Sequence, residues 1–184
     1  MGQGQNWVAS WANFNGHLEY WRFYQSTQFI HLFAVAERAK IEWHKNIEEA
    51  MKWHLSYRED IDWDSVPGYF SIINFLYTVT EIYEFATRLC QAQVYKDKLM
   101  IDIQLRKING FMLAADKKRS WHENYQSNEE ILSFNREYNT DDIIAFSNKY
   151  ALETVIHFFE RFGWLSPAEA LLREEQEKFL SGQY

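Results

Sequence analysis

Histidine and cysteine are side chains that often carry chemistry, and this chain of 184 residues has six histidines and one cysteine. The single cysteine, Cys90, lies in a strongly apolar stretch, so we expect a buried free thiol. The six histidines complete neither a Glu-x-x-His element nor a zinc-type Cys/His spacing. His44 with Glu48, and His157 with Glu160, have a helical spacing that is typical of local ion pairs. The sequence therefore predicts neither a metal nor a cofactor.

One pair has the residue types that phosphodiester cleavage requires. Arg38 and His44 are separated by five residues. Histidine titrates near neutral pH and serves as an acid or a base, and arginine offers a two-pronged donor to a phosphate. The segment resembles the Arg-x(4–6)-His element of the HEPN ribonucleases, whose helical bundles dimerise and bring two such elements together. The resemblance implies that His44 would act as acid and base and that Arg38 would hold the phosphate.

A second cluster combines positive charge with an aromatic ring. It consists of Lys117, Lys118, Arg119 and Trp121. Such a cluster can grip a nucleic-acid strand through phosphate contacts and base stacking. The whole chain is acidic, however, with 19 basic and 26 acidic residues and a net charge of −7, which opposes non-specific binding to nucleic acid. The sequence therefore favours a protein partner and keeps nucleic-acid contact at this cluster as an alternative.

Aromatic residues are dense near the N-terminus of a chain that has 14 Phe, 11 Tyr and 8 Trp. The predicted partner-binding residues are Trp7, Trp11, Phe14, Trp21 and Tyr24. On a helix, the first three would share one face, and so would the last two. Tryptophan and tyrosine are favoured in interfaces because one edge of the ring tolerates water. The set therefore predicts a surface for self-association or for a protein partner, with core packing as the competing interpretation.

The elements that must position these residues are predicted to be helices throughout. The chain has 7 Gly and 2 Pro, well below average usage, which argues against a turn-rich all-β fold. We expect an all-α single domain over residues 1–184, with five to seven helices around a central hydrophobic helix. The predicted elements are a long helix over 17–58, an acidic loop over 59–68, the central helix over 69–95, and helices over 97–125, 128–138, 141–162 and 167–180.

Local start and stop signals set these boundaries. Ser127 and Glu130 have the spacing of a capping box, which places a helix after them. Gly163 is a natural left-handed residue after a helix end, and Ser166 followed by Pro167 is a typical helix start.

The leading functional hypothesis is a non-catalytic helical interaction or scaffold protein that works through the N-terminal aromatic residues. The absence of phosphate-loop, nucleophile-elbow and zinc motifs favours it over an enzyme. The alternatives are the HEPN-like ribonuclease and the binding of an apolar small molecule in the bundle core. No apolar run is long enough to span a membrane, no secretory signal is visible, and cysteine is scarce, so we expect a cytoplasmic protein.

Overall fold

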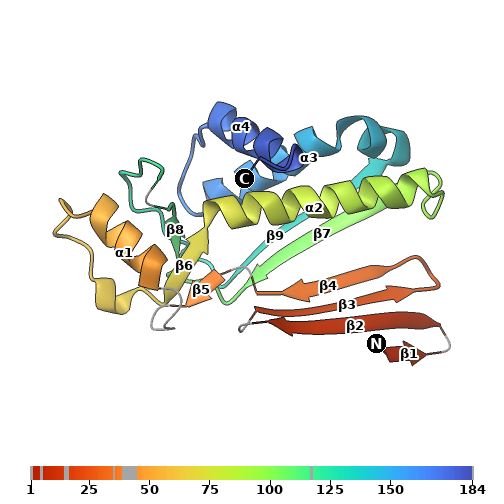
Figure 1. The fold of residues 1–184 in the computed structure, drawn as a ribbon, viewed down its shortest axis with the longest axis horizontal. Helices are drawn as coiled ribbons and strands as arrows, with labels where there is room; N and C mark the ends of the chain where they lie inside the picture. Colours follow the sequence, from red (N-terminus) through yellow and green to blue (C-terminus); the bar gives the residue numbers. More distant parts are fainter. Residues whose placement is uncertain are drawn as a thin grey trace. The chain divides into compact units, whose positions relative to one another are not determined.

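The computed structural model is a mixed α/β protein, so the prediction of an all-α helical bundle is wrong. It describes residues 2–4, 6–14, 17–34, 36–38, 45–116 and 118–183. The described residues form three sheets, with strand orders β1-β2-β3-β4, β5-β6-β8 and β7-β9, together with four α-helices (Figure 1). The chain divides into two compact units, Met1–Val35 and Ala36–Tyr184, and each is described by itself. The single domain over residues 1–184 stays a prediction.

The first unit is an antiparallel sheet whose strands are neighbours in chain order. The strands are β1 (Gly2–Gly4), β2 (Trp7–Phe14), β3 (His17–Tyr24) and β4 (Phe29–Phe33). β2 and β3 pair along their whole length, and β3 and β4 are joined by a tight turn in which Thr27 has a φ of 68°. The first part of the predicted long helix over 17–58 is therefore wrong, because β3, β4 and β5 occupy it.

Aromatic side chains explain why strands form in this segment. They lose rotamer freedom on a helix and pack well on a pleated surface. The four-residue step between Trp7 and Trp11, which fits a helical face, also fits a strand, because residues an even number apart share one face of a sheet. The spacing alone could not separate the two structures.

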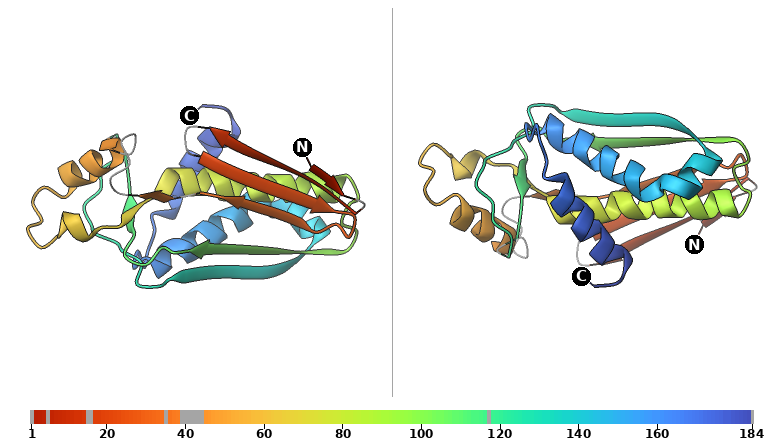
Figure 2. Two further views of the ribbon diagram at one scale, coloured as in Figure 1. Left: turned by 90° about the horizontal axis from the view of Figure 1, so that it is seen from below. Right: turned by 90° about the horizontal axis from the view of Figure 1, so that it is seen from above.

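The second unit combines short and long strands with helices. Its elements are β5 (Ala36–Arg38), α1 (Lys45–His54), the 3-10 helix η2 (Trp63–Ser65), β6 (Gly68–Ser71), α2 (Ile72–Gln91), β7 (Lys98–Arg106), β8 (Met112–Ala114), β9 (Ile131–Asn139), α3 (Thr140–Arg161) and α4 (Glu169–Leu180). β6 pairs antiparallel with β5 and parallel with β8, and β7 pairs antiparallel with β9. β9 packs against α3, and α3 packs along α2 (Figure 2).

The helices predicted over 97–125 and 128–138 are also wrong, because these segments contain β7, β8 and β9. In β7 the buried residues Leu99, Ile101 and Leu105 alternate with exposed ones, and β9 buries Leu132 and Tyr138. This period of two belongs to an antiparallel pair of strands with one face on the core. The competing helical spacing in the same segment misled the prediction.

The expected capping box is a turn. The Ser127 hydroxyl accepts from the backbone N–H of Glu129 and donates to its carbonyl oxygen, both at 3.2 Å, and β9 follows. Serine side chains close such local turns as readily as they cap helices. Gly163 does have the left-handed conformation, with a φ of 95°, directly after the C-cap residue of α3.

The core of the second unit lies between α2 and α3. Phe75 of α2 meets Phe158 of α3 edge to face, with ring centroids 5.3 Å apart, and Phe70 of β6 stacks on Phe162 at 5.1 Å. Such pairs add to the stabilisation from apolar burial. Polar groups run through the same interface, because the buried hydroxyl of Tyr83 on α2 contacts hydroxyls on β9 and α3.

α3 is bent at Phe146, whose φ of −134° and ψ of 21° are not helical. Side chains from two neighbouring helices bind the carbonyl groups beside the bend. The Thr87 hydroxyl of α2 donates to the Ile143 carbonyl at 3.3 Å, and the Gln176 amide of α4 donates to the Asn148 carbonyl at 3.1 Å. α3 contains neither proline nor glycine, so we attribute the bend to these inserted donors.

Within the described residues, no helix has the length and apolar character needed to cross a membrane.

Candidate interaction surface

The register of the N-terminal sheet sets large side chains in rows across its strands. Trp7 lies opposite Tyr24, and Trp11 lies opposite Tyr20, which in turn lies opposite Leu32. Directly opposed residues project from the same side of a sheet, so these five share one face. We call it the Trp11 face, and its described members on β2, β3 and β4 are Trp7, Ala9, Trp11, Asn13, Tyr20, Arg22, Tyr24, Ile30 and Leu32.

Arg22 lies among aromatic rings on the Trp11 face. Its guanidinium carbon is 4.5 Å from the ring centroid of Trp7, 5.5 Å from that of Tyr20 and 5.7 Å from that of Tyr24. Arg22 Nη1 donates a hydrogen bond to the Tyr24 hydroxyl at 3.1 Å, and this bond is the main cause of its raised pKa. The Arg22 guanidinium therefore makes cation–π contacts with rings of β2 and β3, and these contacts hold the rings and the guanidinium in place.

Large apolar groups on this face are open to solvent. Trp11 is 67% exposed and Leu32 is 60% exposed. These two residues are the ends of a row across three strands, and Tyr20 lies between them. The Tyr20 hydroxyl and Arg22 Nε are shielded from solvent, and no hydrogen-bond partner for either atom is found among the described residues. Tryptophan, tyrosine and arginine are the residues most enriched among those that dominate binding energy at protein interfaces. The Trp11 face thus has the composition of an interface centre.

The opposite face of the same sheet is also aromatic. Trp21 belongs to it, because its partners in register are Ser10 and His31. His31 and Phe33 have ring centroids 4.4 Å apart, and His31 Nε2 is 3.9 Å from a carboxylate oxygen of Glu19. The five predicted residues are therefore not on one surface: Trp7, Trp11 and Tyr24 share the Trp11 face, and Trp21 points the other way. The side chain of Phe14 lies outside the described residues.

Sequence reasoning missed Tyr20, Arg22 and Leu32. The available signal was a period of two through β3, where Tyr20, Arg22 and Tyr24 alternate with Glu19, Trp21 and Phe23. Both alternating sets contain aromatic residues, so the pattern has no polar face that would mark a strand.

The structure describes only part of the HEPN-like pair. Arg38 is the last residue of β5, and its backbone pairs with that of Gly68. Arg38 therefore belongs to a strand, whereas the resemblance implied a helix. The side chain of Arg38 and the whole of His44 lie outside the described residues. The helical-bundle fold that the resemblance implied is not the fold of this chain.

The basic cluster is mostly committed to contacts within the second unit. Arg119 forms ion pairs with Asp116 and Glu175. Trp121 is 8% exposed and packs edge to face on Trp164, with centroids 5.0 Å apart. Lys118 is exposed, and Lys117 lies outside the described residues. Gripping a nucleic-acid strand needs free charge and an open ring, and neither Arg119 nor Trp121 offers them.

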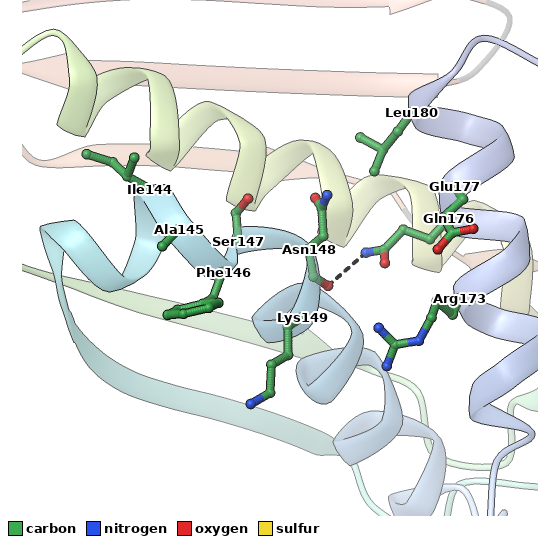
Figure 3. Close-up of a pocket in the computed structure, with 10 residues that line it drawn as sticks. All are labelled: Ile144, Ala145, Phe146, Ser147, Asn148, Lys149, Arg173, Gln176, Glu177 and Leu180. Carbon is green, nitrogen blue, oxygen red and sulfur yellow. Dashed lines mark hydrogen bonds between the residues drawn. The ribbon is translucent and has the colours of Figure 1, made fainter.

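A cavity of about 410 Å³ lies between α3 and α4, beside the bend in α3 (Figure 3). Its lining residues are Ile144, Ala145, Phe146, Ser147, Asn148, Lys149, Arg173, Gln176, Glu177 and Leu180. This lining mixes charged and apolar groups, and the binding of an apolar ligand in the core stays a prediction. In the part of the chain that the structure describes, no three His, Cys, Asp or Glu side chains are grouped to hold a metal ion.

Comparison with protein-family models, curated proteins and solved structures finds no match to this chain.

Proposed function

We propose that this chain is an interaction protein that binds another polypeptide through the Trp11 face of its N-terminal sheet. The observation that carries the proposal is the row from Trp11 through Tyr20 to Leu32, with both ends of the row exposed. Arg22 lies beside this row, among three aromatic rings.

The geometry suits binding because the surface is already ordered. The strands fix the spacing of the rings, and the contacts around Arg22 restrict its long side chain. Ordering interface side chains before binding reduces the entropy that association must otherwise overcome.

The charge distribution supports the same proposal. Residues 1–35 contain one acidic residue, Glu19, and one basic residue, Arg22, so their net charge is zero and the remaining residues account for the −7 of the chain. Interface centres are depleted in charge and enriched in aromatic residues. The neutral, aromatic N-terminal unit therefore fits a binding role better than the acidic second unit does.

We also propose a reducing, cytoplasmic location. The support is the single cysteine, Cys90, which is 1% exposed and whose pKa is raised by burial. Labelling the native protein with a thiol reagent checks that Cys90 is a buried free thiol, because it should then react in full only after unfolding.

Site-specific photo-cross-linking tests the proposed surface. Benzoylphenylalanine replaces Trp11 in one variant, and in the matched control it replaces Trp53, an exposed tryptophan on α1. We expect position 11 to couple to another polypeptide several-fold more efficiently than position 53. Excess wild-type protein should suppress this product, whereas excess Trp11→Ser protein should not. Equal yields at the two positions, or equal suppression by both competitors, would overturn the proposal.

A further inference from the structure

The cavity between α3 and α4 has the size and the mixed lining of a site for a small ligand. Its volume is about 410 Å³, and ligand pockets span roughly 300 to 1,000 Å³, with apolar walls and a few placed polar groups. The cavity lies beside the bend of α3 at Phe146. All its lining residues belong to the second unit, so the cavity is built without the Trp11 face.

The lining residues of α4 are ordered along the helix. Arg173, Gln176 and Leu180 are three and four residues apart, so they share one face of α4. The helical rise places Arg173 and Leu180 about 10 Å apart along the axis. Across the cavity, Lys149 of α3 lies at the Arg173 end and Ile144 lies at the Leu180 end (Figure 3). The cavity is therefore cationic at one end and apolar at the other.

The apolar end presents large side chains to solvent. Phe146 is 51% exposed, Leu180 is 40% exposed and Ile144 is 39% exposed. Single exposed apolar residues are normal on a protein surface, but these three come from two helices and line one cavity. A ligand that covers them removes apolar surface from water, which is favourable.

The cations at the other end keep hydrogen-bond donors for a ligand. Lys149 Nζ lies 3.7 Å from a carboxylate oxygen of Glu153, and Arg173 donates to Glu169. Both ion pairs are at the surface, where such pairs contribute little. A lysine has three donors and an arginine has five, so neither is used up. Glu177 is the one acidic residue of the lining against these two cations, so the lining favours an anionic group.

Gln176 adds an acceptor between the two ends. Its side chain is 2% exposed, and its amide nitrogen donates to the Asn148 carbonyl and to Thr80 Oγ1. The Asn148 carbonyl can only accept, which fixes the orientation of the amide. Gln176 Oε1 has no hydrogen-bond partner among the described residues, although Gln176 lines the cavity. A donor for this oxygen must come from the cavity.

We propose that this cavity binds an N-acylated amino acid with an apolar side chain. The carboxylate of the ligand pairs with Lys149 and Arg173, its amide N–H donates to Gln176 Oε1, and its side chain lies against Ile144 and Leu180. Carboxylate, N–H and apolar group then follow the order of the three lining residues along α4. The same three groups end any polypeptide whose last residue is apolar, and the experiment below separates these two sources.

Titration with N-acetyl-phenylalanine, followed by two-dimensional NMR of the ¹⁵N-labelled full chain, tests the site. We expect saturable shifts within residues 144–149 and 173–180, with a Kd of about 1 mM for a ligand of this size. Three compounds each lack one group: N-acetyl-phenylalaninamide lacks the charge, 3-phenylpropanoate lacks the N–H, and N-acetylglycine lacks the ring. Each should bind about fivefold more weakly or worse. No saturable shift at about 20 mM, or equal binding of N-acetyl-phenylalaninamide, overturns the inference.

Two substitutions in the lining should change the affinity in opposite directions. Arg173→Gln removes a cation and should weaken binding of N-acetyl-phenylalanine about tenfold. Glu177→Gln removes the anion and should strengthen binding about twofold. Lys98→Gln, at an exposed and ion-paired lysine of β7, is the matched control and should bind like wild type. General damage to α4 would weaken both lining variants. An Arg173→Gln variant that binds like wild type, or a Glu177→Gln variant that binds more weakly, overturns the inference.

A short peptide that ends in phenylalanine identifies the source of the ligand. It keeps the carboxylate, the last N–H and the ring, so it should shift the same residues as N-acetyl-phenylalanine does. If the peptide binds about tenfold more tightly or better, the ligand is a polypeptide end, because residues before the last one add contacts. If it binds no more tightly, the ligand is the free acyl amino acid. A peptide with a free carboxylate that shifts none of these residues overturns the proposed recognition.

Discussion

At the scale of single residues, the Tyr83 hydroxyl is the centre of the buried polar network. It lies 2.8 Å from the Tyr138 hydroxyl of β9 and 2.7 Å from Thr154 Oγ1 of α3. All three residues are buried, and burial raises the pKa of Tyr83 far above its ordinary value. One hydroxyl thus joins α2, β9 and α3, so its removal affects three elements.

Tyr83→Phe should lower the free energy of unfolding by about 1–3 kcal/mol, because it leaves buried partners with unmade hydrogen bonds. In the Tyr83→Phe background, Tyr138→Phe should lower the free energy of unfolding by less than it does in the wild type, because the two hydroxyls share one hydrogen bond. Urea denaturation followed by circular dichroism measures both effects. Tyr125→Phe serves as control, because its hydroxyl is not buried in this network. Additive costs for the two network substitutions would contradict the expected coupling.

At the scale of elements, the bend in α3 depends on α4. Gln176 is 2% exposed, and its amide donates to the Asn148 carbonyl and to Thr80 Oγ1, both at 3.1 Å. α4 also stacks Phe179 on Tyr77 of α2, with centroids 4.3 Å apart. One amide therefore connects α4 to the other two helices at the point where α3 departs from helical geometry.

Gln176→Leu should destabilise the protein by about 1–3 kcal/mol, because the Thr80 hydroxyl, which is fully buried, loses the amide that donates to it. Hydrogen exchange should rise in α3 around Asn148 more than in the helix beyond it. Glu177→Gln is the matched control, since Glu177 is the exposed neighbour in the same cavity lining. If both variants exchange alike, the amide does not hold the bend.

The elements also show what the sequence could predict. Helices lie at 72–91, 140–161 and 169–180, where long apolar periodicity and local signals such as Gly163 agree. β4 could not be found this way, because it has large side chains on both faces and offers no alternation of apolar with polar residues. Its conformation is fixed by pairing with β3 across a tight turn, which the pattern of residues within β4 does not reveal. The pairing of β3 with β2 brings Tyr20 and Arg22 onto the same face as Trp7 and Trp11, so the composition of the Trp11 face follows from register and not from spacing along one element.

At the scale of the whole molecule, the buried core belongs to one of the two units. Among the described side chains of Met1–Val35, Ala9 is the one apolar residue that is buried. The largest fully buried side chains lie in Ala36–Tyr184, and they include Tyr69, Phe70, Tyr83 and Phe158. A chain shorter than about 40 residues seldom folds without a disulfide, a metal or a partner, and a lone sheet needs a covered apolar face.

We therefore expect residues 36–184 to fold without the N-terminal sheet. This fragment should unfold cooperatively on heating and keep its near-ultraviolet circular dichroism, because its apolar and polar core contacts are internal to the unit. A peptide of residues 1–35 should lack strand signal when dilute and gain it as concentration rises, since association would cover an apolar face that a lone sheet leaves open. A fragment 36–184 that is unfolded would show that the sheet stabilises the second unit. A fragment that is folded and monomeric, beside a dimeric full chain, would assign association to residues 1–35.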